Sequence, residues 1–277
     1  MKKTVLITGA SSGFGKLTAK KFASRGWNVV ATMRNMQNND MYKDEENIHV
    51  LKLDVTKKET IRNTVNTAIE KFGKIDVLVN NAGYGIAGFL EEADEEEIRV
   101  QFDTNVIGLI NVIQEVVPYM RQEKSGKIIN ITSIGGNVAV PMFSLYSSTK
   151  FAVEGLSRSL AYELKEFGID VKTVAPGGYK TGFVKAVHLI DGDKKEDLNL
   201  YRKTYKQHLE NMMENPPKPF NLGDPKEVAG EIYKCATQKT KVTNFIGKDA
   251  KLMNCLSKIL PEFAFRAMLG KSLLPKY

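Results

Sequence analysis

The chain has 277 residues, of which 42% are hydrophobic, enough to bury the core of one α/β domain. Its formal net charge is +8, but the lysines are dispersed and no nucleic-acid-binding module is present, so nucleic acid is not an expected partner. No apolar run approaches the roughly 20 residues of a membrane span. The two cysteines, Cys235 and Cys255, are too few for a disulfide framework, and we expect a cytoplasmic protein with free thiols.

Segments typical of strands and of helices alternate along the chain. Short β-branched and aliphatic runs predict strands at 4–7, 28–32, 48–53, 75–79, 127–132, 169–174 and 242–246. Apolar residues at helical spacing predict helices at 15–25, 57–72, 94–121, 144–167 and 225–237. The alternation predicts a single α/β domain over residues 1–277. Its core would be a Rossmann-type, doubly wound parallel sheet of about seven strands with helices on both faces.

The first strand runs directly into a glycine-rich loop, Thr8-Gly-Ala-Ser-Ser-Gly-Phe-Gly15. A strand, a glycine loop and a helix in succession form a site where backbone N–H groups and a helix N-terminus receive a pyrophosphate. Gly9 would allow the sharp turn, Gly13 the approach of the phosphates, and Gly15 the close packing of helix on strand. The alternative is an ordinary glycine-rich turn, because the commoner spacing is Gly-x-Gly-x-x-Gly.

The second strand leads to Met33 and Arg34, where an acidic residue would bind the adenosine ribose of NAD. No carboxylate stands there to repel a 2′-phosphate, and the guanidinium of Arg34 could form a charge-assisted pair with one. A solvated arginine in a loop is the alternative. The missing acid predicts NADP(H) as the cofactor in preference to NAD(H).

A tyrosine and a lysine lie one helical turn apart in Tyr146-Ser-Ser-Thr-Lys150. Residues at i and i+4 share a helix face, and a lysine ammonium beside a phenol favours the phenolate and lowers its pKa. Such a tyrosine can act as a general acid or base. Ser133 follows the strand predicted at 127–132. The tyrosine–lysine spacing alone is common, and it gains weight from the glycine loop at the start of the chain.

Taken together, these motifs resemble the short-chain dehydrogenase/reductase family from about Lys3 to about Thr181. The matching pieces are TGASSGFG (8–15), DVT (54–56), NNAG (80–83), NVIG (105–108), ITS (131–133), YSSTK (146–150) and PGGYKT (176–181). Within the family, ATMRN (31–35) and the character of the C-terminal part are similar to the branch of 17β-hydroxysteroid and retinol dehydrogenases.

The resemblance implies four catalytic residues, Asn105, Ser133, Tyr146 and Lys150. Tyr146 would exchange a proton with the substrate oxygen, Ser133 would hydrogen-bond that oxygen, and Lys150 would lower the pKa of Tyr146 and bind the nicotinamide ribose. Asn105 would hold a water that connects Lys150 to solvent, and the simpler interpretation, a buried polar residue that satisfies local backbone, is compatible with that role.

The implied cofactor-binding residues come from the same motifs, with Phe14 where the family more often has isoleucine or leucine. They are Gly9, Ser11, Ser12, Gly13, Phe14, Gly15, Arg34, Asp54, Val55, Asn81, Ala82, Gly83, Tyr146, Lys150, Pro176, Gly177 and Thr181. No metal site is expected, because the three histidines are scattered along the chain.

Beyond Thr181 the resemblance thins. The segment 182–222 is rich in large apolar residues, which predicts either a substrate lid of one or two short helices or added core or subunit contacts. The tail 248–277 is apolar and amphipathic, and three placements fit it: over the pocket, on a partner subunit, or on a membrane surface as a peripheral contact.

The expected function is NADP(H)-dependent hydride transfer between nicotinamide and the carbonyl or the primary or secondary alcohol of a fairly large apolar small molecule. A 3-oxoacyl thioester reductase is one alternative, against which stand the apolar lid and tail. A non-catalytic NADP-binding regulatory protein is another, against which stand the four catalytic residues. The helices 94–121 and 144–167 are apolar on more than one face, which predicts a homodimer or homotetramer.

Overall fold

Seven parallel strands form the central sheet of the computed structural model, which describes residues 2–183, 187–190, 203–205, 207–208, 211 and 222–274. The strand order is β3-β2-β1-β4-β6-β7-β9, and every pairing is parallel. The strands are β1 (Thr4–Ile7), β2 (Asn28–Met33), β3 (Ile48–Lys52), β4 (Val77–Asn80), β6 (Gly126–Ile131), β7 (Ile169–Pro176) and β9 (Thr243–Ile246). The predicted fold class and sheet are confirmed.

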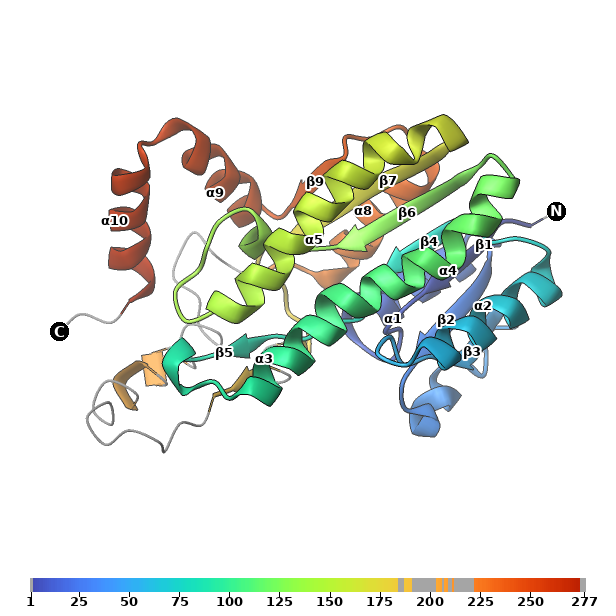
Figure 1. Cartoon of the computed structure of the whole chain (residues 1–277), viewed down its shortest axis with the longest axis horizontal. Coiled ribbons are helices and arrows are strands. Elements are labelled where there is room, and N and C mark those ends of the chain that lie inside the picture. Colours follow the sequence, from blue (N-terminus) through green and yellow to red (C-terminus); the bar gives the residue numbers. More distant parts are fainter. Residues whose placement is uncertain are drawn as a thin grey trace.

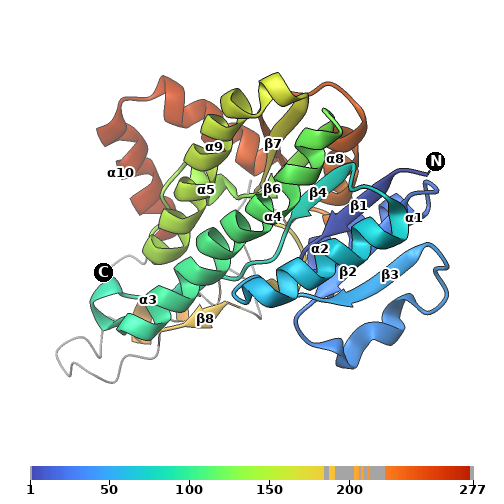
Figure 2. The same cartoon turned by 45° about the vertical axis from the view of Figure 1, so that its right-hand side comes forward.

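Helices cover both faces of the sheet. On one face lie α1 (Gly13–Ala23) and α8 (Pro225–Thr237), and on the other lie α2 (Lys58–Phe72), α4 (Gly108–Gln122) and α5 (Ser144–Glu163). Figures 1 and 2 show α4 and α5 side by side across their face of the sheet. In β1, Val5 and Ile7 face α1 and α8, whereas Leu6 faces the helices on the other side of the sheet. None of the three side chains has exposed surface. Burial on both faces explains why the strands read as continuous apolar runs.

The helix expected at 94–121 has three parts. These are α3 (Glu95–Phe102), a π-helical turn (Asp103–Ile107) and α4. α3 begins with a capping box, in which the Asp94 carboxylate accepts from the Glu97 N–H at 2.7 Å and the Glu97 carboxylate accepts from the Asp94 N–H at 2.9 Å. A π turn inserts an extra residue into a helix and occurs often at functional sites. Asn105 lies in it.

Shorter elements complete the described chain. Short 3₁₀ turns lie at Met36–Tyr42, Leu90–Glu92, Ile134–Gly136 and Lys165–Phe167, the last forming the end of the helix expected at 144–167. Two short strands, β5 (Ile86–Ala87) and β8 (His188–Leu189), pair in parallel outside the main sheet. Most of the predicted lid, 182–222, lies outside the described residues.

The C-terminal tail consists of α9 (Lys248–Ile259) and α10 (Glu262–Leu273), which Figure 1 shows standing out from one end of the molecule. One face of these helices packs on the segment after β6: Met253, Phe265 and Leu269 are buried with Val138, and Ile134 joins them. The three predicted placements of the tail, over the pocket, on a partner subunit and on a membrane surface, stay predictions. None of the helices in the described ranges is both long enough and apolar enough to traverse a bilayer.

Candidate active site

The carboxyl ends of β1, β2 and β4 border a cleft of about 420 Å³. The strand order reverses between β1 and β4, the place where doubly wound sheets bind their ligands. Most of the predicted cofactor-binding residues line this cleft. They are Gly9, Ser11, Ser12, Gly13, Phe14, Arg34, Asp54, Val55, Asn81, Ala82, Gly83, Tyr146, Lys150 and Thr181.

The glycine loop has the geometry that its sequence predicts. Gly9 and Gly13 have φ of 67° and 52°, in the left-handed region that favours glycine. Among the described residues, a Cβ on Gly13 would meet Thr181 alone, at 3.9 Å, so the loop leaves open space there. A Cβ on Gly15 would lie 2.3 Å from the Gly9 carbonyl oxygen, so Gly15 serves helix packing. Open backbone before a helix N-terminus fits a pyrophosphate.

Asn81 fastens this loop to the end of β4. Its side-chain amide donates to the carbonyl oxygens of Thr8 and Gly9 at 3.0 and 2.9 Å. The Thr8 hydroxyl in turn accepts from the backbone N–H groups of Asn81 and Ala82, both at 3.0 Å. The asparagine side chain is thus engaged in shaping the loop.

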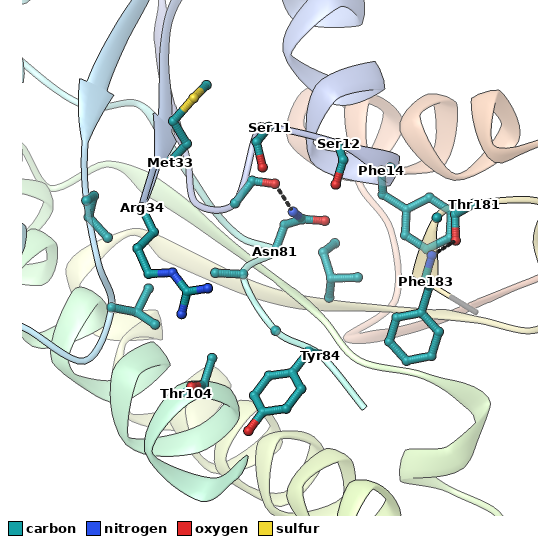
Figure 3. Close-up of a pocket in the computed structure, with 18 of the residues that line it drawn as sticks. Ser11, Ser12, Phe14, Met33, Arg34, Asn81, Tyr84, Thr104, Thr181 and Phe183 are labelled. Carbon is teal, nitrogen blue, oxygen red and sulfur yellow. Dashed lines mark hydrogen bonds between the residues drawn. The ribbon is translucent and has the colours of Figure 1, made fainter. Parts of the chain in front are cut away.

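Arg34 follows β2, and its exposed side chain turns into the cleft. Figure 3 shows the guanidinium pointing toward Thr104, near Tyr84. Burial and Glu97 raise the pKa of Tyr84, whereas the positive charge of Arg34 lowers it, which places the two groups within electrostatic reach. No carboxylate of the described residues pairs with Arg34. Its charge is therefore available to an anionic ligand.

A second cavity, of about 290 Å³, adjoins the cleft and is more apolar in character. Both are lined by Phe14, Thr132, Tyr146, Thr181 and Phe183. Ser133, Pro176 and Gly177 line the second cavity and not the first. Its other walls are largely apolar and include Ile134, Val140, Phe143, Tyr179 and Leu222. Tyr146 lies where the two cavities meet.

The tyrosine and lysine of α5 are together as predicted, but their acidities differ from the prediction. Burial raises the pKa of Tyr146 to about 12, against an opposing hydrogen bond with Ser133. Burial also lowers the pKa of Lys150 to about 8, against the opposing charge of Glu154. The expected lowering of the Tyr146 pKa by Lys150 is thus wrong. The Lys150 ammonium donates to the Ile131 carbonyl at 3.0 Å and lies 5.6 Å from the centre of the tyrosine ring.

Asn105 is buried in the π turn and is fully engaged with neighbouring groups. Its carbonyl oxygen accepts from the Tyr84 N–H at 3.1 Å, and its amide donates to the Tyr84 carbonyl at 2.9 Å and to the Thr149 hydroxyl at 3.1 Å. These contacts match the interpretation as a buried residue that satisfies local backbone. The water relay to Lys150 stays a prediction. A Cβ on Gly83 would lie 2.9 Å from the Asn105 oxygen and 3.8 Å from the Lys150 nitrogen, so this glycine allows both to approach.

Comparison with known families decides the class of protein. The family described as short chain dehydrogenase matches residues 3–189. The chain belongs to this family. Its members carry out dehydrogenase or reductase chemistry, and this short-chain dehydrogenase is an oxidoreductase. The narrower resemblance to the 17β-hydroxysteroid and retinol dehydrogenase branch stays a prediction.

Known relatives cover the chain to different extents. An uncharacterized oxidoreductase of Bacillus subtilis, YusZ, is 38% identical over 98% of this chain and 99% of its own length. A 3-ketodihydrosphingosine reductase of Bacteroides thetaiotaomicron is 48% identical over 182 residues, 65% of each chain. Among solved structures, ElxO with NADP bound has a TM-score of 0.74 and 32% identity, covering 89% of this chain and 97% of that chain.

Two acidic residues of this dehydrogenase support the site and were not predicted from the sequence. Glu154 is buried one turn beyond Lys150, and its carboxylate accepts from the hydroxyls of Thr132 at 2.6 Å and Thr243 at 3.2 Å. The spacing Tyr146-x-x-x-Lys150-x-x-x-Glu154 puts all three on one helix face, a signal that the sequence contained.

Asp249, in the first turn of α9, contacts the loop after β7. Its carboxylate accepts from the Gly178 N–H at 2.6 Å. A Cβ on Gly177 would lie 2.1 and 2.2 Å from the two carboxylate oxygens, so only glycine fits while the carboxylate holds this position. Nothing in the sequence indicates a contact between positions 71 residues apart.

The described part of the predicted lid begins beside the catalytic candidates. The ring of Phe183 lies 5.5 Å from that of Tyr146. Val187 is buried with Ala87, and Phe143, Phe183 and Leu189 pack against them. Tyr84 and Thr104 also line the cleft, although neither was predicted. Tyr84 directly follows the predicted Gly83, and Thr104 directly precedes the predicted Asn105.

Proposed function

We propose that this dehydrogenase transfers a hydride between NADP(H) and the carbonyl or alcohol group of a large apolar substrate. The observation that carries the proposal is the position of Tyr146. It lines both a cleft that begins at a glycine loop and an apolar cavity that contains Ser133. A proton donor at this junction can serve a reaction between a ligand in the cleft and a ligand in the cavity.

The cofactor assignment is supported by the cleft. Gly9, Gly13 and the N-terminus of α1 would hold the pyrophosphate, and Arg34 would pair with a 2′-phosphate. A solved relative, ElxO, has NADP bound. NADP(H) supplies or accepts the hydride, and the protein contributes orientation and proton transfer.

Three side chains would handle the substrate oxygen. Tyr146, whose pKa is about 12, is protonated at neutral pH and is therefore ready to give a proton in the reductive direction. Ser133 lines the same cavity and would hydrogen-bond the oxygen as negative charge develops. Lys150, held by the Ile131 carbonyl, brings a positive charge near the tyrosine ring.

The substrate class is inferred from the second cavity. Ile134, Val140, Phe143 and Leu222 offer apolar surface, and the adjoining segment 182–222 would close over it as a lid, with 248–277 as a separate apolar tail. The similarity to a 3-ketodihydrosphingosine reductase favours a keto group as the reacting centre. A 3-oxoacyl thioester reductase is a second candidate that the same keto chemistry would suit.

The test is a turnover assay with purified protein, NADPH or NADH, and ketones of graded chain length. We expect NADPH consumption that rises with apolar size and is lost in Tyr146→Phe. Thioesters as the best substrates would favour the second candidate. NADPH binding without turnover of any ketone or alcohol would indicate a regulatory protein and refute the proposal.

A further inference from the structure

The turn between α9 and α10 carries exposed apolar side chains. α9 ends at Ile259, Leu260 and Pro261 redirect the chain, and α10 begins at Glu262. On either side of the turn, Ile259 and Phe263 are 71% and 78% exposed. We call Ile259, Phe263 and the residues between them the α9–α10 corner. Large apolar side chains that lie next to each other on an exposed surface often mark a site that binds a membrane or another molecule.

The fold does not need the outer side of this corner. The packing of the tail on the rest of the molecule uses other residues, with Met253, Phe265 and Leu269 buried against Val138. Leu252, 40% exposed, lies two turns before Ile259 on the same side of α9. The outer side is thus an apolar strip that ends at Phe263.

Positive charge surrounds the strip. Between residues 248 and 273 there are five cations against two anions, a net charge of +3; the cations are Lys248, Lys251, Lys258, Arg266 and Lys271, all exposed. Of the anions, Asp249 is turned toward the Gly178 N–H. Glu262 lies 3.8 Å from Arg266 in an exposed ion pair, and such pairs are weak.

We propose that the α9–α10 corner docks on an anionic lipid surface. Ile259 and Phe263 enter the headgroup region, and Lys258 and Arg266 contact lipid phosphates. An anionic lipid surface binds apolar side chains that are surrounded by cationic side chains. Figure 1 shows that the turn between α9 and α10 lies at the outer edge of the molecule, away from the central sheet.

Charge disfavours a second copy of the chain as the occupant. Two corners face to face would bring two clusters of net +3 together, in molecules that each carry +8 overall. A lipid surface also has a functional use, which rests on the proposed function. Ile134 packs against the inner side of the tail and lines the apolar cavity, so docking holds that cavity near a source of apolar substrate.

The test is co-sedimentation of the full chain with vesicles of phosphatidylcholine alone or mixed with phosphatidylglycerol. We expect binding to the anionic vesicles that weakens with salt. The double variant Ile259→Ser/Phe263→Ser should bind about tenfold less or weaker still. Tyr162→Ser, on α5 away from the corner, is the matched control for loss of an exposed ring (82% exposed) and should bind like the wild type. Thermal unfolding verifies that each variant is folded.

Several outcomes overturn the inference. Lipid docking by the corner is excluded if the wild-type protein does not bind anionic vesicles. It is also excluded if the double variant binds them as well as the wild type does. A double variant that turns a wild-type dimer into a monomer in light scattering identifies the corner as a subunit contact instead. Vesicle binding needs no turnover, so inactivity toward every ketone would refute the proposed function and leave the lipid result standing.

Discussion

Replacing Gly177 by alanine tests whether Asp249 holds the loop after β7. The new Cβ would lie 2.1 Å from one carboxylate oxygen, so either the loop or the aspartate side chain must move. The side chain is the more flexible of the two, and its departure breaks the 2.6 Å hydrogen bond from the Gly178 N–H. A hydrogen bond to a charged group contributes about 1.5–3 kcal/mol. At about 2–4 °C per kcal/mol, we expect a melting temperature lower by roughly 3–12 °C.

Activity should fall with stability, because Gly177 and Gly178 line the cavity shared by Ser133 and Tyr146. The assays are thermal unfolding and kcat/KM for a ketone. In an Asp249→Ala background the alanine at 177 has room, so the double variant should be no worse than Asp249→Ala alone. Asp249→Asn keeps an acceptor oxygen and should lose less than Asp249→Ala.

Gly230→Ala is the matched control for Gly177→Ala. Gly230 lies within α8, and its Cβ would have no neighbour within 4 Å in the described part of the chain, so the substitution should be neutral or slightly stabilising. Additive losses in the Gly177→Ala/Asp249→Ala double variant, or a Gly177→Ala protein as stable and active as the control, would refute the reasoning.

Five further expectations follow from the site and the helices. Arg34→Ala should reduce the preference for NADPH over NADH by about 1.5–3 kcal/mol in titrations, and equal wild-type affinities would exclude a 2′-phosphate contact. Tyr146→Phe should abolish turnover with little change in NADPH affinity; retained kcat would rule out this residue as the proton donor. In the reductive direction, kcat/KM should fall above about pH 8, as Lys150 loses its proton while Tyr146, with a pKa of about 12, keeps its own; a profile flat to pH 10 would contradict this. Shortening the segment 186–215 should remove the preference for large ketones without affecting NADPH binding. Light scattering of the wild type should show at least a dimer, because Ile107 and Phe151 are 46% and 44% exposed on the two helices that are predicted to pair with a partner subunit.

The fold and the placing of the motifs could be predicted because they depend on local patterns. β1 is a short apolar run, and the glycines after it have φ values that only glycine adopts readily. The apolar run and the glycines both lie within the first 15 residues of the sequence. The spacing of Tyr146 and Lys150 likewise fixes a shared helix face. The π turn at Asp103–Ile107 was not predicted, because an extra residue in one helical turn leaves the apolar periodicity nearly unchanged.

Two features of the site depend on burial and on distant contacts, which periodicity does not express. The lowering of the Tyr146 pKa was inferred from the neighbouring charge alone, whereas removal of the phenolate from water raises this pKa. The role of Asp249 depends on β9, which brings α9 to the end of β7 by pairing Thr243–Ile246 with Thr173–Pro176. No local sequence pattern predicts this contact between Asp249 and the loop after β7.

The position of Asp249 has a consequence for synthesis on the ribosome. Strands β1, β4 and β6 can pair, and the glycine loop can close, before the last third of the chain has been made. β7 gains its outer neighbour only when β9 emerges, and the Gly178 N–H gains its acceptor only when residue 249 does. Contacts so distant in sequence form late in folding. The cavity that contains Ser133 and Tyr146 therefore gains its last wall only when nearly all of the chain has left the ribosome.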